Sequence, residues 1–66
     1  MIFITLNGER AETRADTLAG LLGELGITPG RVAVELNLKV VKRDLLAEAA
    51  LTEGDRVEVV NFVGGG

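Results

Sequence analysis

The 66-residue sequence contains no cysteine, no histidine, no tryptophan and no tyrosine. Without cysteine it has no disulfide. Without cysteine and histidine it has neither the usual ligands of a zinc site nor the groups of a Cys–His or Ser–His–Asp catalytic arrangement. We therefore expect no bound metal and no catalysis of these common kinds.

Basic residues are also scarce, with seven lysines and arginines against ten acidic residues. The resulting pI near 4.7 argues against sequence-independent nucleic-acid binding, which needs a basic footprint. Mild acidity instead favours a basic protein partner, or serves only solubility.

No hydrophobic run approaches the roughly 20 residues of a membrane span. The apolar stretch at residues 1–6 is too short for a signal peptide and has no positive charge before it. We therefore expect a cytoplasmic protein without a membrane partner. The length allows one domain, and the 47% hydrophobic content argues against disorder.

The opening residues predict a β-hairpin. Residues 2–6 alternate in a strand pattern, with Phe3 on the face opposite the core. Asn7-Gly8 then gives the strongest short signal for a type I′ turn, because both residues tolerate a positive φ. Residues 9–14 form the returning strand.

A helix follows the hairpin. Asp16 is its expected N-cap, with Thr17 as a close alternative, and Gly26 fits the position after its last turn. The helix carries one apolar stripe at helical spacing, made of Leu18, Leu21, Leu22 and Leu25.

The second half predicts further strands at residues 31–37, 39–41 and 56–62, with a short helical turn capped by Asp44 between the last two. The first and last strands are both strongly apolar, so we expect them to be parallel neighbours inside the sheet. This order predicts an α+β roll of the β-grasp, or ubiquitin-like, type. It has a mixed four- to five-stranded sheet with one main helix packed across it, formed by residues 1–62 and followed by a flexible glycine tail at 63–66.

The tail Gly64-Gly65-Gly66 has a strand before it and no helix after it, so it does not fit a phosphate-binding loop. Glycine has no Cβ and the smallest cross-section, so such a tail can enter a narrow channel on another protein and deliver its α-carboxylate there. The simpler interpretation is a frayed terminus.

These features together resemble the ThiS family of sulfur carriers in thiamine biosynthesis. The resemblance covers the full length. It rests on Asn7-Gly8, the helix from Thr17 to Leu25, Asn37 at the end of the third strand, Arg43, and the run from Gly54-Asp55 to Val63-Gly64-Gly65-Gly66. Two positions depart from the family pattern, since Leu38 stands where a glycine is common and Lys42 where a proline is common.

The resemblance implies a protein co-substrate rather than an enzyme. An adenylyltransferase similar to the ubiquitin-activating type would transfer AMP from ATP to the Gly66 carboxylate. A sulfur-donor protein would then leave a thiocarboxylate there, and thiazole synthase would take the sulfur. ATP would be consumed by the activating enzyme, and no cofactor would be bound. The absence of cysteine agrees with this, because it leaves the carboxylate as the conventional attachment point for sulfur.

Strand parity suggests a docking surface. Val60 and Phe62 alternate to the face that Phe3 occupies, so the three side chains are expected to form one apolar patch that docks on a partner. Val63, Gly64 and Gly65 are expected to thread into that partner. For Val60 an equal alternative is cover by the segment around Leu45, Leu46 and Leu51.

Other functions remain open on the sequence alone. The small subunit of molybdopterin synthase has the same thiocarboxylate chemistry, although that family usually has a longer middle region. A ubiquitin-like modifier of lysines and a passive interaction module are the further alternatives.

Overall fold

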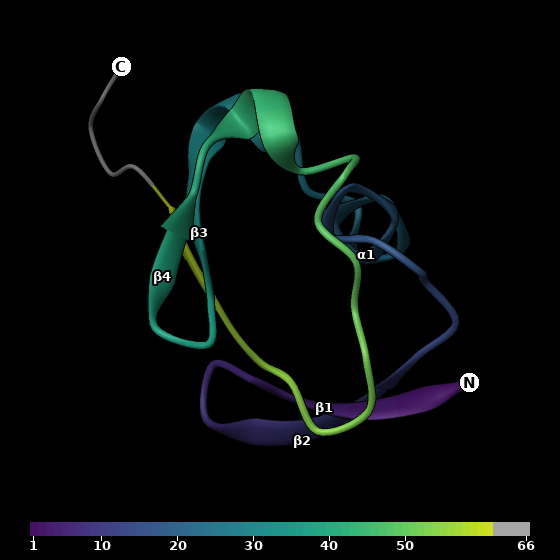
Figure 1. The fold of residues 1–66 in the computed structure, drawn as a ribbon. Coiled ribbons are helices and arrows are strands. Elements are labelled where there is room, and N and C mark those ends of the chain that lie inside the picture. The colour runs from purple at the N-terminus through teal and green to yellow at the C-terminus, as the bar shows by residue number, and fades with distance from the viewer. Residues whose placement is uncertain (62–66) are drawn as a thin grey trace.

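A computed structural model describes residues 1–61, and within them a five-stranded mixed sheet is covered on one face by a single α-helix (Figure 1). The strand order is β2-β1-β5-β3-β4. Figure 1 shows the β1–β2 and β3–β4 hairpins at the two ends of the curved sheet, with β5 crossing between them. The predicted α+β fold, with its mixed sheet and one helix, is confirmed.

The hairpin at the start of the chain forms as predicted. β1 (Ile2–Leu6) pairs antiparallel with β2 (Glu9–Thr13). Asn7 and Gly8 join them with φ of 49° and 84°, the positive values that a type I′ turn needs.

β5 (Arg56–Asn61) is the central strand. It runs parallel to β1 through the pairs Thr5↔Arg56 and Leu6↔Val57. It also runs antiparallel to β3 (Val32–Leu36), and every residue of β3 pairs with a residue of β5. β4 (Lys39–Val41) completes the other edge. The expected parallel pairing of the first and last strands is therefore confirmed.

α1 (Leu18–Leu25) begins one residue later than the preferred prediction. Thr17 is the N-cap, not Asp16, because Thr17 has an extended backbone and its Oγ1 accepts from the N–H of Gly20 at 3.1 Å. The backbone carbonyl of Asp16 instead accepts from Leu51, at 2.8 Å. Gly26 ends the helix with φ 70°, as expected.

The apolar stripe of α1 forms, with Leu18, Leu21 and Leu22 buried and Leu25, at the end of the helix, 43% exposed. One further expectation in this part of the fold is wrong. Asp44 does not cap a helical turn but lies inside the short 3-10 helix η2 (Arg43–Leu45), which Lys42 precedes as N-cap. A second 3-10 helix, η1 (Pro29–Arg31), leads into β3.

The segment between η2 and β5 closes the core beside α1. The backbone carbonyls of Leu46 and Ala49 accept from the N–H groups of Ala19 and Leu18, which have no partner inside the helix. Among the described residues no helix is long and apolar enough to span a membrane. The buried hydrophobic core consists of Ile4, Leu18, Leu21, Leu22, Val32, Val34, Leu46, Leu51 and Val57.

The β3–β4 turn holds a bulky residue in a left-handed backbone. Asn37 and Leu38 have φ of 52° and 72°. Asparagine tolerates this region, whereas leucine is strained there, at a cost of about 1–2 kcal/mol. The Leu38 side chain is 73% exposed, so it gains little from burial in return.

Replacing Leu38 with glycine is expected to raise the free energy of unfolding by about 1 kcal/mol, because glycine adopts the positive φ without strain. Urea denaturation measures the change. Leu38→Ala is the control, since it removes the exposed side chain but keeps the Cβ and hence the strain, and it should leave stability nearly unchanged. Equal gains from both variants would show that the exposed side chain, not the backbone, is the source of the cost.

Candidate functional site

The predicted reactive end, Gly66, and the residues expected to thread and dock beside it, Phe62 to Gly65, lie outside the described residues. The structure does describe the strand that leads to them, β5, and the surface around that strand.

Asn7 holds β5 on its β1 side. Its backbone N–H donates to the Val57 carbonyl at 2.9 Å. Its side-chain Oδ1 accepts from the N–H of Val59 at 2.7 Å, and its Nδ2 donates to the Val59 carbonyl at 3.2 Å. The amide group therefore replaces the next strand residue of β1, beyond the point where that strand turns away.

Asn37 holds the start of β5 from the other side. Its backbone N–H donates to the Arg56 carbonyl at 2.7 Å, and its Oδ1 accepts from the N–H of Arg56 at 2.9 Å. Its Nδ2 donates to Oδ1 of Asp55 at 3.1 Å. The two asparagines thus bind the backbone of β5 on opposite edges.

Asp55 fixes the turn that starts β5. Partial burial works against its ionisation, but hydrogen bonds from the Thr52 N–H, at 2.8 Å, and from Asn37 outweigh that effect. They hold the pKa of Asp55 below its ordinary 3.8, so the carboxylate is ionised at neutral pH. A charged acceptor strengthens both hydrogen bonds.

The helix-free face of the sheet carries an apolar patch beside the end of β5. Val60 is 56% exposed, and Ala33 lies directly opposite it on β3. Val40, on β4, is 71% exposed on the same face. We call Ala33, Val40 and Val60 the valine patch. The alternative that the middle segment covers Val60 is wrong, because Leu46 and Leu51 are buried in the core on the other face.

Phe3 does not belong to the valine patch. The parallel register pairs Thr5 with Arg56, so Phe3 lies six strand positions before Val60, roughly 20 Å along the sheet. The Arg10 guanidinium covers the Phe3 ring, 4.0 Å from its centroid. The expected juxtaposition of Phe3 with Val60 is therefore wrong, and a docking role for Phe3 stays a prediction.

Sequence reasoning missed several members of this site. Ala33 and Val40 belong to the valine patch, and the alternation of side chains along β3 and β4 could have indicated them. The side-chain bonds of Asn7 and Asn37 to β5 join residues 52 and 19 positions apart, so no local pattern indicates them. Within residues 1–61, no group of three or more acidic side chains is placed to hold a metal ion.

Asn7→Gly is expected to lower the free energy of unfolding by about 1–2 kcal/mol and to speed hydrogen exchange at the Val59 amide. Glycine keeps the positive φ of the turn but removes both side-chain hydrogen bonds. Exchange monitored by NMR measures the effect. Asn7→Asp is the control, because it retains an acceptor for the Val59 N–H and should protect that amide. Unchanged exchange at Val59 in Asn7→Gly would contradict the role given to the Asn7 amide.

Comparison with known proteins identifies the family. The family model described as "ThiS family" matches residues 4–66. The sulfur carrier protein ThiS of Bacillus subtilis is 32% identical, over 96% of this chain and 98% of its own length. A crystal structure of the thiamine biosynthesis protein ThiS from Geobacter metallireducens superposes with a TM-score of 0.83 at 32% identity, covering 98% of this chain and all of that one.

Two longer relatives are thiazole synthases, from Magnetococcus marinus at 50% identity and Paramagnetospirillum magneticum at 44%. Each match covers 96% of this chain, whereas the chain spans only about a fifth of the length of either synthase. From the family match, the full-length ThiS relative and the shared fold, the chain belongs to the ThiS family, the sulfur carriers of thiamine biosynthesis.

Proposed function

We propose that this chain carries sulfur as a thiocarboxylate on Gly66 and delivers it for formation of the thiazole of thiamine. The observation that carries the proposal is the family match, which extends through residue 66 and so includes the glycine end. The fold supports it, because the central strand β5 leads directly towards that end and is held on both edges up to Val59.

The chemistry needs an activated carboxylate, because a carboxylate anion repels nucleophiles and has no good leaving group. In the proposed first step, an oxygen of the Gly66 carboxylate attacks the α-phosphorus of ATP, and pyrophosphate leaves. A hydrosulfide ion released by a sulfur-donor protein then attacks the carbonyl carbon of the acyl-adenylate, AMP leaves, and loss of a proton gives the thiocarboxylate. A partner adenylyltransferase of the ubiquitin-activating type would supply the catalytic groups and consume the ATP.

The chain's own contribution is presentation. Val63, Gly64 and Gly65 would enter the partner's channel, where glycine allows close approach of backbone groups on both sides. Phe62 and Val60 would dock at the mouth of that channel, with Ala33 and Val40 extending the apolar contact. Phe3, far along the sheet from Val60, would serve a separate part of the partner surface.

Thiazole synthase is the proposed consumer of the sulfur. Two thiazole synthases contain a segment 44% and 50% identical to this chain, which supports a functional link between the two. Their names also favour the thiamine pathway over molybdopterin synthesis and over lysine modification as the function of this chain.

Incubation with the adenylating enzyme, ATP and a sulfur source is expected to replace one oxygen of the chain by sulfur, as measured by intact mass spectrometry. Deleting Gly66 should abolish the change, and Gly65→Ala should reduce it, because the added Cβ widens the part of the tail that enters the channel.

Gly23→Ala is the matched control, since a Cβ at Gly23 would meet no atom within 4 Å. It should react like the unmodified chain. An absence of any ATP-dependent mass change with competent partners would refute the proposal, and slower-migrating conjugates would favour a protein modifier instead.

A further inference from the structure

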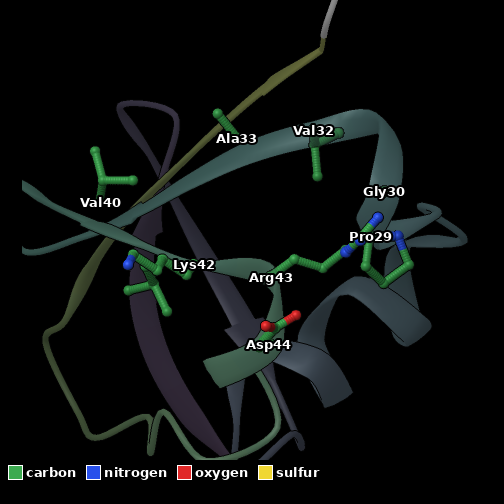
Figure 2. Close-up of a pocket in the computed structure, with 9 residues that line it drawn as sticks. Pro29, Gly30, Val32, Ala33, Val40, Lys42, Arg43 and Asp44 are labelled. Atoms are coloured by element: carbon green, nitrogen blue, oxygen red, sulfur yellow. The ribbon is translucent and has the colours of Figure 1, made fainter.

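A groove of about 370 Å³ lies next to the valine patch, between η1 and the stretch that leads from β4 into η2 (Figure 2). Its apolar walls include Val32, Ala33 and Val40. Ala33 lies directly opposite Val60 in the β3–β5 pairing, so the groove adjoins the end of β5.

The segment that supplies the groove is net basic although the chain as a whole is acidic. Residues 28–44 contain four of the seven basic residues and two of the ten acidic ones, Glu35 and Asp44. All four basic residues are exposed, and Lys42 and Arg43 line the groove, together with the carboxylate of Asp44. The four are Arg31, Lys39, Lys42 and Arg43.

The exposed Arg43 side chain lies across the groove. Figure 2 shows its side chain reaching from η2 towards Gly30 in η1. A Cβ at Gly30 would lie 3.0 Å from Nη1 of Arg43, so the absence of a side chain at Gly30 leaves room for the guanidinium. Its planar donors thereby lie beside an apolar surface, an arrangement suited to a carboxylate next to a hydrophobic side chain.

We propose that this groove binds an acidic segment of the adenylating partner, with an apolar side chain against Ala33 and Val40 and carboxylates on Lys42 and Arg43. Charge complementarity argues for an acidic occupant, since the rest of the described chain carries most of the acidic residues and would repel one. The apolar walls of the groove include Ala33 and Val40 of the valine patch, and such an apolar surface argues for a protein segment rather than a small anion. The inference rests on the proposed function for the identity of the partner.

Isothermal titration calorimetry with the purified adenylating enzyme tests the groove. Arg43→Gln and Lys42→Gln are each expected to raise Kd about fivefold at low salt, with a smaller ratio at high salt. Arg14→Gln is the matched control, because it removes the same charge from an exposed position after β2 and should leave Kd nearly unchanged.

Equal weakening by Arg14→Gln and Arg43→Gln would assign the effect to net charge and overturn the inference, as would unchanged binding in all three variants. Intact mass at saturating enzyme separates this result from failure of the proposed function. If the unmodified chain gains sulfur while Arg43→Gln binds equally well, only the groove assignment is wrong. If the unmodified chain gains no sulfur, the proposed function fails and the inference fails with it.

Discussion

The side-chain amides of Asn7 and Asn37 act as extra strand residues against β5, and the position of this central strand depends on them. β1 pairs with β5 at only two positions before the chain turns back into β2. Asn7 continues that pairing to Val59, and Asn37 closes the other edge at Arg56. β5 is therefore bound on both edges up to Val59, and in the proposed function it is the strand that precedes the reactive glycine end.

Much of the fold could be predicted because its signals are local. Asn7-Gly8 specifies the first turn, the leucine spacing specifies the helix, and alternation specifies which strand residues face the core. Two wrong predictions, the Asp16 cap and the Phe3–Val60 patch, depend on contacts between residues far apart in the sequence. Thr17 and Asp16 are both good caps, and only packing against the segment near Leu51 decides between them. Parity placed Phe3 and Val60 on the correct face, but it contains no information on register, which sets them far apart along the sheet.

The distribution of charge shows a similar limit of sequence reasoning. The net charge favoured a basic partner, whereas folding places Lys42 and Arg43, together with Asp44, at one groove that includes part of the valine patch. A partner that docks there meets a basic and apolar surface next to β5. The overall acidity of the chain favours solubility.

Transfer of sulfur from a preformed thiocarboxylate to the thiazole product is the decisive test of the proposed carrier function. The chain bearing a C-terminal thiocarboxylate is mixed with thiazole synthase and its substrates, and both carrier and product are followed by mass spectrometry. We expect the carrier to return to its carboxylate mass while one sulfur atom per carrier appears in the thiazole product. A thiocarboxylate that persists while the synthase is active with another sulfur source would contradict the carrier function.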